Sequence, residues 1–263
     1  MRLEVISRQP RAGRARPAPV LFVHGLFVGA WGWAEHFLDY FAAHGYATHA
    51  LSLRAHGQSE GREGLRWTRL ADYVDDVAQV VAELPTPPIL IGHSYGGATV
   101  QKFLETREAP AAVLLASIPP QGLLQTALRM ALRHPWAFLK VNLTWTLYPL
   151  VGTPALARDL FFSPEMAEEK VSEYQARMSD ESFMAFLDML VLNLPRPQRI
   201  TAPMLVLGAA NDTSIRPRQV EATARAYNTQ PVIFPGMNHG MMLESGWQTV
   251  ADRIIAWLTE KGL

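Results

Sequence analysis

Short apolar runs recur along the chain, and within each run the apolar residues are continuous rather than alternating with polar ones. The runs are 19–23, 46–51, 88–91, 111–116, 203–207 and 231–234, of which the second is the weakest. Continuous runs of this length are typical of parallel strands that are buried on both faces. Helical patterns lie between several of them, so the sequence predicts an α/β fold with a doubly wound, mostly parallel sheet.

Three stretches between or after these runs have a helical pattern. Residues 68–84 carry apolar side chains at steps of three and four, the spacing of one helix face, and Thr68 is predicted to cap this helix. The other two predicted helices are 96–106 and 247–258.

Residues 119–197 interrupt the alternation of strands and helices. The segment is rich in large apolar side chains and contains no strand-like run. Two helix starts are predicted in it, one at 163–165 and one at 179–181. We therefore expect an all-helical cap of residues 119–197, inserted into a core of residues 1–118 and 198–263.

Charge and composition narrow the classes of function. The formal net charge is zero, so nucleic acid is not an expected partner. The absence of cysteine excludes disulfides, thiolate catalysis and cysteine-ligated metals. The N-terminus lacks the apolar stretch of a secretory signal. The sequence also contains no run of about 18 or more charge-free apolar residues, the length needed to span a bilayer. The expectation is a cytoplasmic protein without stable membrane insertion.

One local charge bias stands out near the N-terminus. Residues 8–19 include Arg8, Arg11, Arg14 and Arg16. A nucleic-acid or membrane-binding arm is one interpretation of this segment. A solvated loop between two strands is the interpretation we favour, because four positive charges form only a weak patch.

The strongest chemical signal is the sequence GHSYGG at 92–97, directly after the apolar run 88–91 and before a predicted helix. A serine on a sharp strand-to-helix turn has strained backbone angles, so its neighbours must be small, and glycine meets that need. The turn places the Ser94 hydroxyl at the N-terminus of the helix, where partial positive charge favours a developing anion. Ser94 is therefore the predicted nucleophile.

A serine nucleophile needs a base and an acid. When the serine lies on such a strand-to-helix turn of an α/β fold, the order along the chain is serine, acid, histidine. Of the eight histidines, only His239 follows a late strand at the same sheet edge, so it is the predicted general base. Asp212, after the run 203–207, is the predicted acid. Residues 117–120, after the run 111–116, include no carboxylate, and Glu244 is the remaining rival.

Negative charge that develops on a carbonyl oxygen needs backbone N–H donors. Tyr95, the residue after the nucleophile, provides one. The turn at 24–27 after the first central run is placed to provide another, which we assign to Leu26.

The order of motifs resembles the α/β-hydrolase fold superfamily over nearly the whole chain. The matching motifs are His24-Gly25 with the downstream GAW at 29–31, LRAHGQS at 53–59, GHSYGG at 92–97 and NHG at 238–240. The second is similar to the family's D-x-R-G-H-G-x-S loop, with Ser52 and Ala55 as departures. The resemblance implies a triad of Ser94, Asp212 and His239, an oxyanion hole at Leu26 and Tyr95, and a helical cap.

The resemblance leaves the reaction open, because one fold supports many reactions. Epoxide hydrolases and haloalkane dehalogenases of the superfamily use an aspartate nucleophile, and its hydroxynitrile lyases usually keep a lysine after the histidine. This chain has Ser94 and Gly240 at those positions. The first expectation is therefore a serine carboxylesterase. The alternatives are a carbon–carbon bond hydrolase, a cofactor-free peroxidase and a hydrolase-like ligand receptor.

The apolar residues near these motifs suggest an apolar ester with a short or medium acyl chain as substrate. The residues expected to line its pocket are Phe27, Trp136, Trp145, Phe183 and Met237. Neither a cofactor nor a metal is expected, because no His/Asp/Glu cluster has ligand spacing. The oligomeric state stays open.

Overall fold

The computed structural model describes residues 1–10 and 15–263, so Arg11 and Arg14 of the arginine-rich segment lie outside the described residues. Seven strands form one sheet in the order β1-β3-β2-β4-β5-β6-β7. They are β1 (Glu4–Arg8), β2 (Val20–Val23), β3 (Thr48–Ser52), β4 (Ile89–His93), β5 (Ala112–Leu115), β6 (Met204–Ala209) and β7 (Pro231–Phe234). All neighbours are parallel except β1, which pairs with β3 in antiparallel register. The predicted fold class is confirmed: each apolar run overlaps one strand, and β1 is an addition to them.

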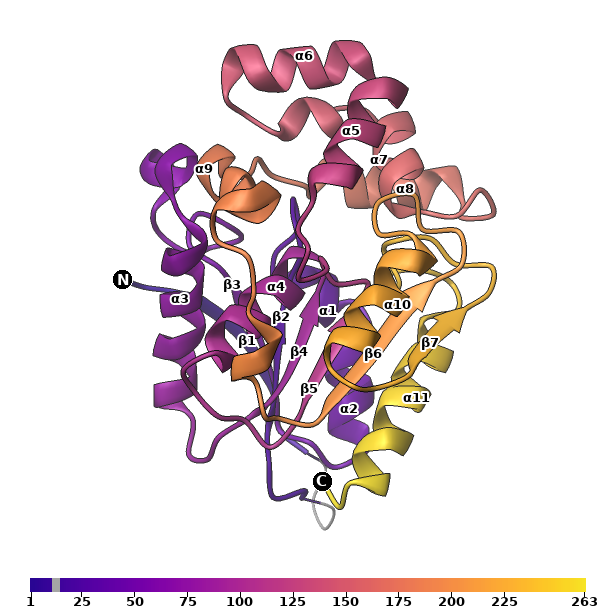
Figure 1. Ribbon diagram of the computed structural model, residues 1–263. Coiled ribbons are helices and arrows are strands. Elements are labelled where there is room, and N and C mark those ends of the chain that lie inside the picture. Colours follow the sequence, from indigo (N-terminus) through magenta and orange to yellow (C-terminus); the bar gives the residue numbers. More distant parts are fainter. Residues whose placement is uncertain (11–14) are drawn as a thin grey trace.

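Helices cover both faces of the sheet, as Figure 1 shows. They are α1 (Trp31–Ala34), α2 (Phe37–Ala43), α3 (Leu70–Glu83), α4 (Tyr95–Leu104), α10 (Pro217–Ala226) and α11 (Trp247–Glu260), and a 3₁₀ turn, η1 (Arg62–Trp67), precedes α3. Successive strand residues point to opposite faces. Thus Ile91 packs in the cluster with α2 and α11, whereas Leu90 packs in the cluster with α3, α4 and α10. Burial on both faces explains why the strand sequences are continuously apolar.

The helix predicted over 68–84 begins two residues later than its pattern suggested, because α3 starts at Leu70 with Arg69 as its N-cap. The Thr68 hydroxyl instead donates to the Gly64 carbonyl. The first N–H groups of the helix are held by carboxylates: Asp72 accepts from Arg69 N at 2.7 Å, and Asp188 accepts from Leu70 N at 3.0 Å. Asp188 lies 118 residues away, so the sequence near the helix could not reveal this contact.

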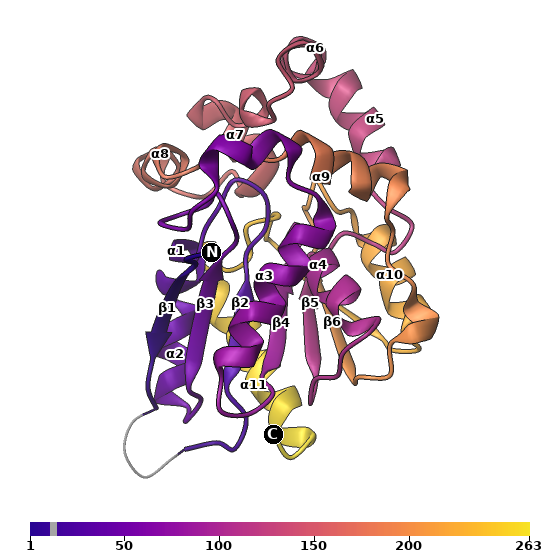
Figure 2. The ribbon, with the colours of Figure 1, turned by 90° about the vertical axis from the view of Figure 1, so that its left-hand side faces the viewer.

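The chain between β5 and β6 is helical, and residues 119–197 contain no strand. We call this segment the cap. Its elements are α5 (Leu124–Arg133), α6 (Pro135–Thr144), η2 (Tyr148–Leu150), α7 (Pro154–Phe161), α8 (Glu168–Ala176), α9 (Phe183–Leu187) and the π-helical turn η3 (Asp188–Leu192). A further 3₁₀ turn, η4 (Pro197–Arg199), begins at the last residue of the cap. Figures 1 and 2 both place α5 to α8 beyond one end of the sheet, with α6 farthest from it. The limits of the cap as a domain, residues 119–197, stay a prediction.

Both helix starts predicted inside the cap are displaced. The expected start at 163–165 is a turn, and α8 begins only at Glu168. Ser163 does not cap a helix, because its N–H and hydroxyl both donate to the buried Glu244 carboxylate, at 2.6 and 2.7 Å. The expected start at 179–181 also shifts, since α9 begins at Phe183 and Ser182 caps it. In both places, contacts with the core override the local capping pattern.

Within the described residues, none of the helices combines the length and the apolar character required to cross a bilayer.

Candidate active site

Ser94 occupies a strained turn between β4 and α4. Its φ and ψ angles are 51° and −113°, outside the regions that non-glycine residues usually adopt. The neighbouring glycines are required by close packing. A Cβ on Gly96 would lie 2.3 Å from the His24 carbonyl oxygen, and one on Gly92 would lie 2.6 Å from the Gly96 carbonyl oxygen. The turn therefore holds the Ser94 hydroxyl at the sheet edge, at the N-terminus of α4.

The structure brings Ser94, His239 and Asp212 into one hydrogen-bonded chain. His239 Nε2 lies 2.8 Å from Ser94 Oγ, and His239 Nδ1 lies 2.7 Å from Asp212 Oδ2. All three residues are buried. The carboxylate orients the ring with its proton on Nδ1, which leaves the Nε2 lone pair free to accept the serine proton. This arrangement can remove a proton from Ser94 at the moment of attack.

The second oxygen of Asp212 is held by backbone N–H groups. Oδ1 accepts from Ser214 N at 2.7 Å and from Ile215 N at 2.8 Å. The rival carboxylate, Glu244, points elsewhere: it accepts from Ser163 and, at 3.3 Å, from Asn238 N. Glu244 therefore links the cap to the loop that carries His239 and makes no hydrogen bond to the imidazole.

A second histidine supports the His239 loop from below. His93 Nε2 donates to the His239 carbonyl at 2.9 Å. Burial, with the neighbouring His239, lowers the pKa of His93 well below its usual value of 6.5. His93 is thus neutral near pH 7, and it adds no fixed positive charge beside the ring that must become protonated.

The two backbone N–H groups assigned from the sequence to the oxyanion hole are those of Leu26, in the loop after β2, and Tyr95, the first residue of α4. No residue of the described chain accepts a hydrogen bond from either group. The loop is held in shape at Phe27, whose φ is 67°, a left-handed conformation. Phe27 N donates to Glu181 Oε1 at 2.8 Å, and its carbonyl accepts from Ser179 N at 2.9 Å. The cap segment just before α9 therefore holds both backbone groups of Phe27.

Glu181 is a residue that the sequence did not assign to the site. Its Oε1 atom also lies 3.0 Å from His56 Nε2, and both side chains are buried. His56 Nδ1 carries a proton, because it donates to the Arg54 carbonyl at 2.9 Å. A second proton, between His56 Nε2 and the Glu181 carboxylate, is shared by these two groups. Burial alone would lower the pKa of His56, but the charge and hydrogen bond of Glu181 outweigh it and raise that pKa above 6.5.

His24 completes the support beneath this loop. Its Nδ1 donates to the Gly25 carbonyl at 2.8 Å, and its Nε2 accepts from Leu53 N at 3.0 Å. Burial and the nearby His56 lower the pKa of His24 to about 3. The sequence interpretation of His24 as structural agrees with these contacts. The Glu181 contact had no comparable local signal, because 125 residues separate its partner His56 from it.

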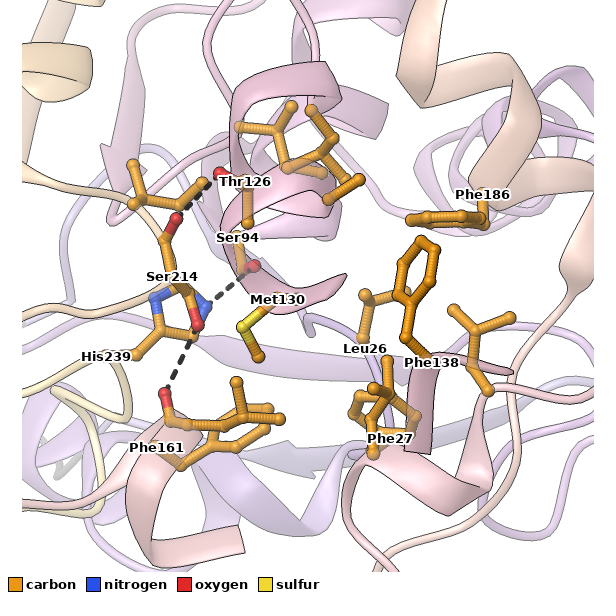
Figure 3. A pocket seen from close by; sticks show the side chains of 17 residues that line it. Leu26, Phe27, Ser94, Thr126, Met130, Phe138, Phe161, Phe186, Ser214 and His239 are labelled. Atoms are coloured by element: carbon orange, nitrogen blue, oxygen red, sulfur yellow. Dashed lines mark hydrogen bonds between the residues drawn. The ribbon is translucent and has the colours of Figure 1, made fainter. Parts of the chain in front are cut away.

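A narrow apolar cavity opens directly above Ser94 and His239 (Figure 3). Its volume is about 70 Å³. Ten of its seventeen lining residues belong to the cap, and none of the seventeen is a carboxylate, lysine or arginine. In Figure 3, Ser94 and His239 lie on one side, opposite Phe27, Phe138 and Phe186. The cap therefore supplies most of the surface that a bound substrate would touch.

Of the residues expected to line this cavity, the structure places only Phe27 in the wall. Trp136 is 77% exposed on the outside of the cap. Trp145 stacks on Phe183 with ring centroids 5.4 Å apart, and neither ring belongs to the lining. Met237 is buried against Gly246. Helix orientation decides which apolar side chains face inward, and the composition of the cap could not provide it.

No group of three or more histidine, aspartate or glutamate side chains that could hold a metal occurs in residues 1–10 and 15–263.

Comparisons with known proteins agree with this fold. Residues 20–253 match the model of the alpha/beta hydrolase family. Three solved structures are similar over nearly the full length of both chains. A monoacylglycerol lipase from Paleococcus ferrophilus has 20% identity and a TM-score of 0.75, with 99% of this chain and 100% of that chain covered. A putative non-heme bromoperoxidase from Mycobacterium tuberculosis has 21% identity and a TM-score of 0.75, with 99% and 97% covered.

The third is a thermophilic esterase from Thermogutta terrifontis, with 19% identity, a TM-score of 0.70, and 98% of this chain and 94% of that chain covered. At these identities the structures share the fold, and the family match, which spans most of the chain, carries the assignment. The chain belongs to the alpha/beta hydrolase family.

Proposed function

We propose that the protein is a serine hydrolase that cleaves carboxylic esters with a slim, apolar acyl chain through an acyl-enzyme intermediate. The observation that carries the proposal is the Ser94–His239–Asp212 hydrogen-bonded chain at the base of an uncharged, narrow cavity.

In the first half-reaction, Ser94 Oγ attacks the ester carbonyl carbon while its proton moves to His239 Nε2. The resulting imidazolium is stabilised by the Asp212 carboxylate at 2.7 Å. The carbonyl oxygen gains negative charge and accepts from the N–H groups of Leu26 and Tyr95. When the tetrahedral intermediate collapses, the bond to the alkoxy group breaks, and Nε2 returns the proton to the leaving alcohol.

In the second half-reaction, water takes the place of the alcohol. His239 Nε2 accepts a proton from water, the hydroxide attacks the acyl carbon, and the proton then returns to Ser94 Oγ as the acid departs. The N–H groups of Leu26 and Tyr95 serve both half-reactions, because the oxyanion forms at the same place in each.

The shape and chemistry of the cavity support the choice of substrate. Its side walls are formed by apolar side chains such as Met130, Phe138 and Leu147, and it contains no cation to pair with a charged substrate. Burying alkyl groups there is favourable, at about 0.8 kcal/mol per methylene. A straight acyl chain suits a narrow space better than a bulky ring does.

A series of p-nitrophenyl esters with acyl chains from acetyl to palmitoyl tests the proposal. We expect kcat/KM to rise with chain length until the cavity is filled and then to fall. Ser94→Ala should abolish both turnover and covalent labelling by a fluorophosphonate, whereas Ser59→Ala, which removes another buried serine hydroxyl, should leave labelling intact. Labelling at a residue other than Ser94 would overturn the assignment of the nucleophile.

Comparison of this ester series with a diketone substrate and a peracid assay separates the other reactions that Ser94, His239 and Asp212 can support. A stoichiometric burst without further turnover would indicate a ligand receptor. Faster cleavage of a diketone than of any ester would indicate a carbon–carbon bond hydrolase. Peracid formation from acetate and hydrogen peroxide that exceeds ester hydrolysis would indicate a peroxidase, the activity named for the Mycobacterium tuberculosis structure.

A further inference from the structure

The outside of the cap exposes an unusual number of large apolar side chains. Of the twelve that are exposed in the described chain, ten belong to the cap. Single exposed apolar residues are common on protein surfaces, but a contiguous group marks an interaction site. The largest exposures on α5 and α6 are Leu132 at 85%, Trp136 at 77% and Leu143 at 73%.

These side chains form rows along two packed helices. On α5 the exposed row is Leu124, Leu128 and Leu132, at steps of four. On α6 it is Trp136, Leu139 and Leu143, at steps of three and four. Such spacing places each row on one face of its helix. We call the two rows together the outer cap face.

The opposite faces of the same helices line the cavity above Ser94. Ala127 and Met130 of α5 and Phe138 of α6 are lining residues. Each helix is therefore apolar on the side that faces the cavity and also on a side that faces outward. On α5 the polar side chains are confined to one stripe that includes Gln125, Arg129 and Arg133. A surface helix normally turns its apolar stripe to the core and its polar side chains outward, so the exposed leucine rows point to a second apolar environment.

The charge of this region indicates what that environment is. No aspartate or glutamate occurs between Glu108 and Asp159 in the sequence. A groove of about 640 Å³ beside Trp136 on the outside of the cap is lined by Arg133, His134 and Lys140 and by no carboxylate. Arg133 and His134 pair with Asp159 below the groove, while no acidic partner in the described chain lies within ion-pair distance of Lys140. Tryptophan and tyrosine beside cations are typical of side chains at a bilayer–water interface.

We propose that the outer cap face docks on an anionic phospholipid surface. The leucine rows and Trp136 enter the outer acyl region, and Lys140 meets the phosphate groups of the lipids. Contact with the apolar layer shields the side of α5 and α6 that the core leaves uncovered.

A second copy of this chain fits the outer cap face less well. In a twofold symmetric dimer the same patch meets itself. That contact would bring Lys140 near its own copy, with no carboxylate on α5 or α6 to pair with it. A lipid surface supplies both the apolar layer and the negative charge.

Vesicle binding tests the proposal without any turnover, so its failure is distinct from failure of the proposed esterase. Full-length Ser94→Ala protein is sedimented with vesicles of phosphatidylcholine, with and without phosphatidylglycerol. We expect binding that is tighter on the anionic vesicles. Adding L132Q and L143Q should weaken it by about tenfold or more, because two leucines no longer enter the layer. The same pair in the otherwise native chain should leave hydrolysis of a water-soluble short ester unchanged, since neither residue lines the cavity.

Charge substitutions provide matched controls. Lys140→Gln should weaken binding about fivefold on anionic vesicles, with little change on neutral ones. Arg107→Gln removes an exposed arginine beyond the C-terminal end of α4, at the opposite edge of the sheet from the cap, and should change neither. Equal binding of L132Q/L143Q and its parent, or no binding of the parent to either vesicle, would overturn the proposal. So would a dimer in sedimentation velocity that the two leucine substitutions dissociate.

Discussion

At the scale of single residues, the candidate site consists of ordinary side chains in unusual surroundings. The strained turn at Ser94 is tolerated because Gly92 and Gly96 leave room for backbone atoms closer than a Cβ would permit. Two buried carboxylates, Asp212 and Glu244, lie on either side of the His239 loop and have separate roles. Asp212 faces the imidazole, whereas Glu244 ties the loop to the cap.

This separation predicts different effects of two matched substitutions. Asp212→Asn should lower kcat by about three to four orders of magnitude, because the imidazole loses both its orientation and its counter-charge. Glu244→Gln should lower the midpoint of thermal unfolding and leave kcat within a few-fold of the native value. Steady-state kinetics and melting curves of both variants check this. Near-native kcat in Asp212→Asn would contradict the assignment of the acid.

The residue scale is also where sequence reasoning worked best. The three side chains of the predicted triad lie within hydrogen-bond distance in the order expected, because a nucleophile turn and a histidine loop at one sheet edge converge. The role of Glu181 was hidden, because a carboxylate before an apolar helix has the same local pattern as an ordinary helix start. Its partners His56 and Phe27 come from other parts of the chain.

At the scale of elements, the loop after β2 depends on the cap. Its left-handed residue, Phe27, has its N–H held by Glu181 and its carbonyl held by Ser179 N. The buried His56 beside Glu181 fixes the carboxylate in turn. A cap segment thus holds the backbone next to Leu26, whose N–H we propose as an oxyanion donor.

We therefore expect Glu181 to behave as a positioning residue. Glu181→Ala should lower kcat by about 10- to 100-fold with KM changed little, because a displaced Leu26 N–H weakens binding of the oxyanion more than binding of the substrate. Glu181→Gln retains an acceptor for Phe27 N–H and should lose less. Affinity for a trifluoromethyl ketone, which mimics the tetrahedral intermediate, should fall in parallel with kcat.

The neighbouring carboxylate offers a control in the same segment. Asp180 accepts from Leu147 N and Tyr148 N within the cap and does not touch the loop after β2. Asp180→Asn should therefore reduce thermal stability without changing the kcat of the folded enzyme. Suppose that Asp180→Asn instead reduced kcat and left KM unchanged, as we expect for Glu181→Ala. A general loosening of the cap would then explain both results, and the positioning role of Glu181 would be refuted.

At the scale of the whole molecule, burial of histidines couples stability to pH. The pKa of His24 is lowered to about 3 and that of His93 well below 6.5, both chiefly by burial. Burial also lowers the pKa values of His36 and His49. Below pH 6.5 the unfolded chain therefore binds more protons than the folded chain. The free energy of unfolding must decrease there as the pH is lowered. His56 acts oppositely: its pKa is raised, so its contribution is present below pH 6.5 and lost as pH rises through the raised value.

We expect the free energy of unfolding to be greatest near neutral pH. On the acidic side it should fall by up to about 3 kcal/mol per pH unit from His24 and His93 together, at about 1.4 kcal/mol per proton and pH unit. Urea unfolding between pH 4.5 and pH 8 measures this dependence directly. A protein that became more stable from pH 6.5 to pH 5 would contradict the neutral, buried state of these two histidines.

The sequence by itself determined six of the seven strands, the mostly parallel character of the sheet and the residues of the proposed triad. These features follow from local signals: continuous apolar runs, a glycine-bounded serine, and polar residues that follow strands at one edge. Only the tertiary structure decided the helix starts near Thr68, Ser163 and Ser179, the walls of the cavity and the contacts of Glu181. Each of these depends on which side of a helix faces the core, or on partners tens to more than a hundred residues away. Side-chain composition is the same for an inward and an outward row, and only packing distinguishes the leucines of the outer cap face from the residues that line the cavity.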